Sequence, residues 1–326
     1  MKALLCKEHG PPEKLVVEDV PSPEPKKGEV RINLKAAGVN FPDTLIIRNL
    51  YQFKPDLPFS PGGEASGVVD KLGEGVSHLK DGDRVLVMCG NGAFAEQIAV
   101  DASRVIPIPD DMDFDIAAGF TMTYGTSHHA LKQRGDLKPG ETLLVLGAAG
   151  GVGLAAVEIG KLMGAKVIAA ASTQEKLDLC KEYGATEFIN YSDEDLREGI
   201  KRTTGGAGPD VIYDPVGDKF FEPAFRSIGW NGRYLVIGFA GGEIPKLPMN
   251  LPLIKGAAIV GVFWGSFTAR EPKVHQENMT ELMGWLNDGK LKPYVSKRFP
   301  LEEGGEAIRW MMDRKAMGKV LVEIGD

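Results

Sequence analysis

The chain has 326 residues, of which 43% are hydrophobic and 25% are charged, so it has the composition of a folded globular protein and is long for a single compact core. Its formal net charge of −7 argues against nucleic acid as a main partner, and it contains no apolar run long enough to span a membrane. The three scattered cysteines fit a reducing compartment. We therefore predict a cytoplasmic protein of two domains that binds neither membranes nor nucleic acid.

The first part of the chain is predicted to consist of short strands separated by turns rich in glycine and proline. We expect these strands over residues 1–5, 15–19, 30–37, 65–72, 84–88 and 94–100. Short strands at this spacing indicate a partly closed β barrel.

From residue 114 onward the apolar period becomes helical, and strands then alternate with helices. The expected helices cover residues 115–120, 122–131, 174–183, 193–203 and 220–228, and the expected strands cover 187–189, 210–213 and 232–237. Such alternation predicts a doubly wound parallel sheet. A further apolar strand, over residues 257–264, either closes this sheet or pairs across a dimer.

The end of the chain contains a predicted helix at 277–287, a second at 306–313 and a strand at 319–324. This tail is too short for a separate domain, so we expect it to return to the first one. The predicted domains are therefore residues 1–122 with 266–326, and residues 123–265.

The most informative stretch is a glycine-rich turn between two apolar runs. A run at 143–146 precedes Gly147-Ala148-Ala149-Gly150-Gly151-Val152-Gly153, and a helical pattern and a second run at 167–171 follow. Strand, glycine turn, helix and strand within about 30 residues are typical of a dinucleotide-binding fold, although the first glycine of G-x-G-x-x-G is here Ala148. We expect Gly150 to make the tight turn and Gly153 to pack the helix on the strand. The turn from Ala149 to Val152, through Gly150 and Gly151, is expected to contact the pyrophosphate.

The end of the second apolar run indicates which dinucleotide is bound. A site for NAD carries a carboxylate about 20 residues after the glycines, where it binds the ribose 2′-hydroxyl. Here Ser172 lies 19 residues after Gly153, and Lys176 follows it. Hydroxyls and an ammonium group accept a 2′-phosphate, which a carboxylate would repel. The sequence therefore predicts NADPH, and the alternative for Lys176 is an ordinary solvated lysine on a helix.

Several motifs along the chain resemble those of one enzyme family. They are Gly38-Val39-Asn40-Phe41-Pro42-Asp43-Thr44, Pro61-Gly62-Gly63-Glu64-Ala65-Ser66-Gly67-Val68-Val69, Gly82-Asp83-Arg84-Val85 and Gly318-Lys319-Val320-Leu321. Together they are similar to the zinc-free quinone oxidoreductase (zeta-crystallin-like) branch of the medium-chain dehydrogenases/reductases. The resemblance implies an α/β protein with an N-terminal GroES-like partly open β barrel and a Rossmann domain, whose C-terminal segment returns to the first domain.

The residues present do not favour a metal site. Zinc-containing members of this superfamily carry a cysteine near the position of Asn40 and a histidine where this chain has Gly63. His128 and His129 form the local histidine pair, and we expect one of them in the core and the other in solvent. A catalytic zinc needs about three nitrogen, sulfur or carboxylate ligands, so we predict a metal-free protein.

Without a metal, hydrogen bonds must polarise the substrate carbonyl. The resemblance places Asn40 beside the nicotinamide, where it is the candidate donor to the substrate and also a contact of the cofactor; the alternative is an asparagine that only caps a turn. Tyr51 is a candidate proton donor or a wall of the substrate pocket. Many members have a tyrosine at the position of Leu45, so this departure leaves water as the alternative proton source.

The resemblance also implies contacts with the rest of the cofactor. Thr123 is expected at the nicotinamide ribose or phosphate, and Tyr191 near the adenosine 2′-phosphate with Lys176. Arg314 and Lys319 are the cationic candidates in the C-terminal segment, and Lys319 is favoured because Gly318-Lys319-Val320 matches the family ending. The residues expected along the nicotinamide are Gly238, Phe239, Phe263 and Trp264, although the aromatic side chains Phe239 and Trp264 fit a core position equally well.

We therefore predict a metal-free, NADPH-dependent reductase that transfers a hydride to a quinone or another electron-poor conjugated carbonyl. The first alternative is a reductase of enals, enones or enoyl thioesters on the same fold. The second is a protein that binds NADPH with little turnover. By analogy with the family, we expect a homodimer that pairs through the edge strand of the Rossmann domain.

Overall fold

The structure, a computed structural model, describes residues 1–325 and divides into two compact units. Unit 1 comprises Met1–Met122 together with the chain from Pro293 onward, and unit 2 comprises Thr123–Lys292. The sequence predicts the return to the first domain at residue 266, whereas in the structure it comes at Pro293. The reason is that helix α9 (Pro272–Asn287) belongs to unit 2, where it is hydrogen-bonded to residues 128–133.

Unit 1 is built on a mostly antiparallel sheet that the long strand β3 dominates. The strands of the unit are β1 (Lys2–Leu5), β2 (Val16–Asp19), β3 (Glu29–Val39), β4 (Glu64–Leu72), β5 (Arg84–Met88), β6 (Gln97–Asp101), β7 (Val105–Pro107), β14 (Val295–Pro300) and β15 (Lys319–Glu323). Of these, β1 and β2 form a separate two-stranded sheet, and β14 pairs with β15 in parallel. The sheet order is β14-β15-β3-β4-β5-β7. The first half of β3 also pairs with β6 and its last residues pair with β15, so β3 contacts three strands.

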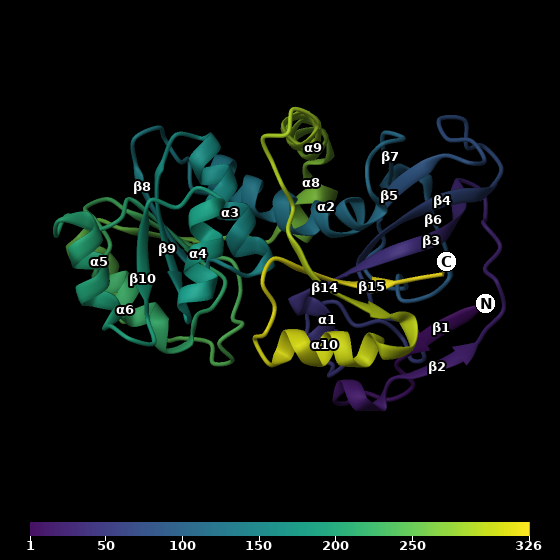
Figure 1. Cartoon of the computed structure of the whole chain (residues 1–326), viewed down its shortest axis with the longest axis horizontal. Helices are drawn as coiled ribbons and strands as arrows, with labels where there is room; N and C mark the ends of the chain where they lie inside the picture. The colour runs from purple at the N-terminus through teal and green to yellow at the C-terminus, as the bar shows by residue number, and fades with distance from the viewer. Residues whose placement is uncertain (326) are drawn as a thin grey trace. The chain divides into compact units, whose positions relative to one another are not determined.

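The core of unit 1 lies under one face of this sheet. Alternate residues of β3, Val30, Ile32 and Leu34, are buried, as the period of a half-buried strand requires. Helices α1 (Phe41–Ile46) and α10 (Gly304–Met312) contact each other, and Ala307 and Ile308 of α10 join the same core (Figure 1).

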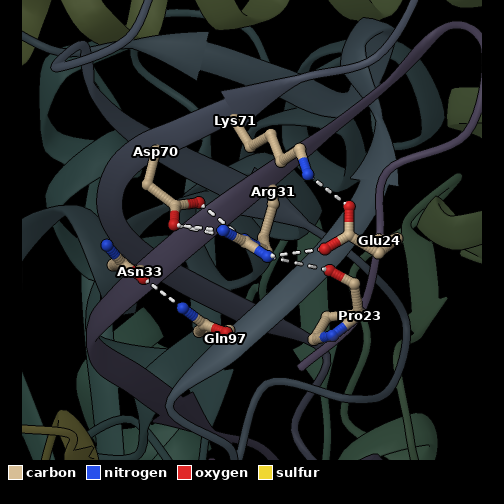
Figure 2. A network of polar contacts seen from close by, with 7 residues as sticks. All are labelled: Pro23, Glu24, Arg31, Asn33, Asp70, Lys71 and Gln97. Atoms are coloured by element: carbon tan, nitrogen blue, oxygen red, sulfur yellow. Dashed lines mark hydrogen bonds and ion pairs between the residues drawn. The ribbon is translucent and has the colours of Figure 1, made fainter. Parts of the chain in front are cut away.

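A polar network on unit 1 ties a loop to the sheet (Figure 2). The guanidinium of Arg31 on β3 donates to both carboxylate oxygens of Asp70 on β4, at 3.0 and 2.9 Å, and also reaches Glu24. Asn33 and Gln97, which are directly paired on β3 and β6, are joined by a side-chain hydrogen bond of 2.7 Å. These side chains bond to one another, so the network has a structural role.

Unit 2 has the predicted doubly wound sheet. Its strands are β8 (Thr142–Leu146), β9 (Lys166–Ala171), β10 (Glu187–Asn190), β11 (Val211–Asp214), β12 (Arg233–Val236) and β13 (Ala258–Gly261). They are parallel and lie in the order β10-β9-β8-β11-β12-β13, which is the 3-2-1-4-5-6 order of dinucleotide-binding folds. The expectation of a parallel α/β domain is confirmed.

Helices cover this sheet. They are α3 (Gly151–Leu162), α4 (Gln174–Glu182), α5 (Leu196–Thr204), α6 (Phe221–Arg226), α7 (Asn250–Lys255) and α8 (Trp264–Arg270), with α9 following; α2 (Phe114–His129) begins in unit 1 and ends in unit 2. Ile200 of α5 and Phe225 of α6 pack with Leu144 and Ile168 of the strands in one buried cluster. Burying each such side chain contributes about 1.5–3 kcal/mol to folding. No helix in residues 1–325 is both long and apolar enough to cross a membrane, and the cytoplasmic location stays a prediction.

Five of the helices and strands given above were not predicted from the sequence. These are α1, β7, β14, α7 and α8, and the expected strand at 257–264 is also shorter, ending at Gly261. In β14 only Phe299 is buried, so the segment lacks the apolar alternation of a strand and owes its conformation to pairing with β15. In the 257–264 run, Trp264 begins α8, because an apolar run alone does not distinguish a strand from the start of a buried helix.

The histidine pair also differs from the prediction, because both side chains are buried. His128 is bonded through Nε2 to Glu281 of α9 at 2.9 Å, and burial lowers its pKa to about 4 although the carboxylate of Glu281 opposes this shift. His129 is bonded to Gln133 and stacks on Phe267 at 3.8 Å. The pair therefore packs α2 against α8 and α9.

The buried His128 makes the stability of the protein depend on pH. The neutral imidazole is favoured in the folded state, whereas in the unfolded chain it binds a proton below pH 6.5. The free energy of unfolding should thus fall as the pH drops from 6.5 towards 4, with up to about 1.4 kcal/mol per pH unit coming from this group. We expect urea titrations at several pH values to show that the free energy of unfolding falls less steeply with decreasing pH for His128→Gln than for the wild type. The control variant is His78→Gln, because His78 is exposed, and it should keep the pH dependence of the wild type. If the free energy of unfolding depended on pH equally in the wild type and in His128→Gln, His128 would not be the cause of the destabilisation in acid.

Candidate functional site

In unit 1, the candidate catalytic residue Asn40 lies where three chain segments meet. Asn40 directly follows β3, Glu64 begins β4, and Lys319 begins β15. Both β4 and β15 run antiparallel to β3, with Gly38 paired to Glu64 and Val39 paired to Val320. The starts of these two strands therefore flank the end of β3, which brings Glu64 and Lys319 to Asn40.

These three side chains form one buried network. The Nδ2 group of Asn40 donates to Oε1 of Glu64 at 2.9 Å and to the carbonyl of Gly38 at 3.2 Å. The ammonium of Lys319 donates to Oδ1 of Asn40 and to Oε1 of Glu64, both at 2.8 Å. The second oxygen of Glu64 accepts the N–H of Met122 at 2.8 Å. Nearly every donor and acceptor that is removed from water here is satisfied.

This geometry changes two expectations about the site. The third hydrogen of Lys319 goes to the carbonyl of Val39 at 3.1 Å, so its ammonium is fully used within unit 1. Lys319 is thus placed as a buried partner of Glu64, whereas the sequence had suggested a cation for the cofactor. Asn40 is the N-cap residue of α1, as the alternative expected, but its side chain also bonds to Glu64 and Lys319, and both of its amide hydrogens already have acceptors.

Two more ionisable groups lie near the network. The carboxylate of Asp43 accepts the N–H of Asn40 at 2.8 Å and that of Gly62 at 3.1 Å, and burial raises its pKa to about 6. Tyr51 is half-buried against the core of unit 1, and burial, together with the charge of Asp43, raises the pKa of its phenol. The phenol of Tyr51 therefore keeps its proton at neutral pH.

In unit 2, the glycine turn connects β8 to α3. The glycine that makes its tight turn is not the one that the sequence predicted. Gly147 has φ +56°, which favours glycine, whereas Gly150 has φ −75°, which any residue adopts. Gly147, and not Gly150, therefore makes the tight turn. A Cβ on Gly153 would lie 2.3 Å from the carbonyl of Gly147, so Gly153 allows the helix to approach the turn.

The start of α3 has the chemistry of an anion site. Gly150 is its N-cap, and no side chain bonds there, so the first N–H groups of the helix, from Gly151 and Val152 onward, have no partner within the helix or from a capping side chain. The positive end of a twelve-residue helix adds to their attraction for a phosphate. Ala149, which we expected at the pyrophosphate, is buried beneath this turn, so only its backbone is suited to such a contact.

The residues expected at the 2′-phosphate come together at the ends of β9 and β10. The ammonium of Lys176 lies 3.4 Å from the hydroxyl of Ser172, and the N–H of Tyr191 donates to the carbonyl of Ala171 at 3.1 Å. Ser192, which was not predicted from the sequence, lies beside them, and its hydroxyl donates to the carbonyl of Ser172 at 2.9 Å. Its position directly after Tyr191, at a strand end of the same sheet, was the signal that could have identified it.

Asp214, at the end of β11, holds the turn that follows this strand, and the residues after β12 pack on the same turn. The buried carboxylate of Asp214 accepts the N–H groups of Val216 and Gly217 at 2.7 and 2.8 Å and the hydroxyl of Tyr234 at 2.5 Å. The ring of Phe239 covers Gly217, where a Cβ would lie 2.9 Å from it. Gly238 and Phe239 are half-buried at the carboxyl end of β12. They therefore lie at the same edge of the parallel sheet as the glycine turn.

Two of the expected cofactor contacts occupy enclosed positions in unit 2. Trp264 is 5% exposed; its indole fills the gap left by Gly125 of α2 and meets the ring of His275 edge-on at 5.5 Å. It is a core residue, as the alternative reading of the sequence allowed. Thr123 is also buried, whereas Phe263 is 55% exposed at the start of α8.

The donor set does not resemble a metal site. Within residues 1–325, no three histidine, cysteine, aspartate or glutamate side chains gather in a way that could hold a metal ion. Cys89 lies near Gly62, to whose carbonyl its Sγ is bonded at 3.5 Å, and burial raises the pKa of this thiol to about 12. Such a thiol is a poor source of the thiolate that zinc prefers.

Comparison with known proteins gives two matching family profiles. The family described as "Alcohol dehydrogenase GroES-like domain" matches residues 26–110, and the family described as "Zinc-binding dehydrogenase" matches residues 151–286. The two profiles lie within units 1 and 2, respectively.

Relatives match over nearly the whole chain. "Quinone oxidoreductase-like protein 2 homolog" of Nematostella vectensis is 40% identical over 98% of this chain and 88% of its own length. The crystal structure of Escherichia coli quinone oxidoreductase complexed with NADPH is 30% identical, with a TM-score of 0.92 over 99% of this chain and 100% of that one. The crystal structure of CurK enoyl reductase is 27% identical, with a TM-score of 0.88 over 99% and 98%.

Proposed function

Because the chain belongs to the quinone oxidoreductase branch of the medium-chain dehydrogenases/reductases, we propose that it is an NADPH-dependent reductase of quinones or related conjugated carbonyl compounds. The observation that carries this proposal is the cluster of Ser172, Lys176, Tyr191 and Ser192 at one end of the sheet of unit 2, with the uncapped start of α3 beside the next strand. It offers two phosphate-binding regions to one dinucleotide.

The residues of unit 2 fit NADPH in charge and in shape. The N–H groups at the start of α3 would bind the pyrophosphate, and the absence of a side chain at Gly153 keeps the turn compact. Lys176 and the hydroxyls of Ser172 and Ser192 would bind the 2′-phosphate. NADPH, when bound, supplies the hydride of the reaction.

In unit 1, Asn40 would bind the oxygen of the acceptor. Reduction of a quinone to the hydroquinone consumes one hydride and one proton, and negative charge develops on the oxygen that is conjugated to the attacked atom. A hydrogen bond from Nδ2 of Asn40 would stabilise this charge. For this, the acceptor oxygen has to replace the carbonyl of Gly38, whose bond to Nδ2 is the longer of the two at 3.2 Å. Tyr51 or water would deliver the proton, and the raised pKa of the half-buried phenol makes Tyr51 a weaker acid than a free tyrosine.

A second function is favoured by the structural likeness to CurK enoyl reductase, whose TM-score is 0.88. In this case the hydride goes to the β-carbon of an enal, an enone or an enoyl thioester, and the proton goes to the α-carbon. Both functions use the same hydride source and the same polarised oxygen, so they differ in which acceptor the protein turns over.

We further propose that the reaction needs no metal. Asn40, Glu64 and Lys319 occupy the end of β3 with hydrogen bonds, and an ammonium group next to the carboxylate opposes the binding of a second cation. Although one matching family is described as zinc-binding, the described side chains do not form a ligand set of the usual kind.

The direct test is the oxidation of NADPH, followed at 340 nm, with 9,10-phenanthrenequinone, 1,4-benzoquinone, an enal and an enoyl thioester in parallel. We expect turnover with the quinones, because the relatives that match the chain over nearly its whole length are named as quinone oxidoreductases or quinone oxidoreductase-like proteins. Turnover confined to the enal or the thioester would establish the second function instead. Tight binding of NADPH without turnover of any acceptor would contradict both and would identify a protein that binds the cofactor only.

The assignment of the 2′-phosphate site predicts a change in cofactor preference. In Ser172→Asp, a carboxylate at the end of β9 repels the 2′-phosphate and can bind a ribose 2′-hydroxyl. The ratio of kcat/KM for NADPH to that for NADH should fall by roughly tenfold to a hundredfold, which corresponds to about 1.4–3 kcal/mol. The matched control is Ser172→Asn, because asparagine has nearly the same size as aspartate but no charge. This variant should keep the wild-type preference for NADPH. An unchanged ratio in Ser172→Asp would refute the assignment.

We also propose that two copies of the chain pair through β13, which is one of the two edge strands of its sheet. Ile259 on this strand is 40% exposed, and Leu253 and Ile254 of the preceding helix are also exposed. An apolar strand edge of this kind is favourable only when another chain covers it. Light scattering after gel filtration should give a dimer for the wild type and a monomer for Ile259→Lys with Leu253→Glu. A monomeric wild type would contradict the proposal.

A further inference from the structure

Lys319 is an unusual residue to find in the core of unit 1. Its side chain is 3% exposed, and its three ammonium hydrogens go to three oxygens, those of Glu64, Asn40 and Val39, at 2.8–3.1 Å. Glu64, its partner in the ion pair, is 1% exposed. A buried ion pair of this kind adds little net stability compared with apolar residues of the same volume. A role beyond stability would therefore explain its presence better.

The ion pair determines how the amide of Asn40 is oriented. An ammonium group only donates hydrogen bonds, so Oδ1 of Asn40 must face Lys319. An ionised carboxylate only accepts them, so Nδ2 must face Glu64. The reversed amide would set donor against donor and acceptor against acceptor. Two opposite charges thus fix the two ends of one neutral side chain.

This orientation leaves one amide hydrogen suited to an external acceptor. The bond from Nδ2 to Glu64 is 2.9 Å long and goes to a charge, whereas the bond to the carbonyl of Gly38 is 3.2 Å, at the long end of the usual range. Asn40 is 6% exposed, which is more than Glu64 or Lys319. In addition, an ammonium bonded to Oδ1 withdraws electrons from the amide and strengthens Nδ2 as a donor.

We propose that Lys319 is a positioning residue for the reduction: bonded to Asn40 and held by Glu64, it orients the amide of Asn40 so that Nδ2 is the donor to the acceptor oxygen. This inference rests on the proposed reductase function. Lys319 acts through Asn40 and does not itself touch substrate or cofactor.

The test removes both charges together. Lys319→Met by itself leaves Glu64 buried without its counter-charge and is expected to be unstable. The double variant Lys319→Met with Glu64→Gln leaves no uncompensated charge, so it should fold with a thermal midpoint near that of the wild type. We expect its kcat for a quinone to fall by roughly a hundredfold, the typical cost of one lost hydrogen bond to a developing charge. The KM for the quinone and the Kd for NADPH should change little.

Two further variants test whether the loss of kcat in the double variant acts through Asn40. Asn40→Ala should lose about as much kcat as the double variant, and combining the three substitutions should cause no further loss, because they remove the same interaction. The control is Arg31→Met with Asp70→Asn, which removes a different ion pair of unit 1, between β3 and β4 (Figure 2), and should leave kcat unchanged. A stably folded double variant with wild-type kcat would overturn the proposal, and so would independent, multiplying losses in the triple variant.

A separate readout distinguishes failure of this inference from failure of the proposed function. If the wild type binds NADPH but reduces no acceptor, the complex with NADP⁺ is titrated with 4-nitrophenolate, whose oxygen resembles the charged product. The inference predicts that the wild-type complex binds this probe and that the double variant binds it at least about tenfold more weakly. Equal affinities, or no binding by the wild type, would overturn the inference.

Discussion

A buried ammonium next to a buried carboxylate is the constraint on which the site in unit 1 depends. Neither Lys319 nor Glu64 can be removed from water unless its hydrogens or lone pairs find partners, and these partners come from the end of β3 and from the N–H of Met122. The requirement joins the start of β4, the end of β3 and the start of β15 at one point. Asn40 stands at that point, so the charges that need compensation also orient the amide that is proposed to polarise the substrate.

In unit 2, the geometry of the parallel sheet, and not an ion pair, brings the residues of the site together. The carboxyl ends of all its strands lie at one edge, so the turns after β8, β9 and β10 bring the start of α3, Ser172 and Tyr191 to the same edge. The glycines of the turn after β8 keep the backbone close, and the hydroxyl and ammonium groups after β9 and β10 supply polar contacts. The backbone therefore provides one phosphate region and the side chains provide the other.

The sequence predicted what depends on local pattern and missed what depends on distant partners. Apolar alternation and glycine spacing were sufficient for β5, for the six parallel strands of unit 2 and for the glycine turn. They could not give β14, in which pairing with β15 replaces apolar alternation, nor the enclosed position of Trp264, which depends on the small Gly125 of α2. The motif around Lys319 drew attention to this residue, but its partner Glu64 lies 255 positions earlier in the chain. Only the folded sheet brings the two together, and for this reason the sequence suggested a contact with the cofactor instead.

We propose that this chain reduces its acceptor with NADPH while hydrogen bonds of the protein, and not a metal ion, polarise the oxygen. The decisive experiment is the turnover of a quinone by protein that has been dialysed against a strong chelator, with the zinc content of the same sample determined by plasma mass spectrometry. We expect kcat with NADPH to be the same before and after dialysis while zinc is far below one ion per chain. Activity that disappears with the metal and returns when zinc is added would contradict the proposal.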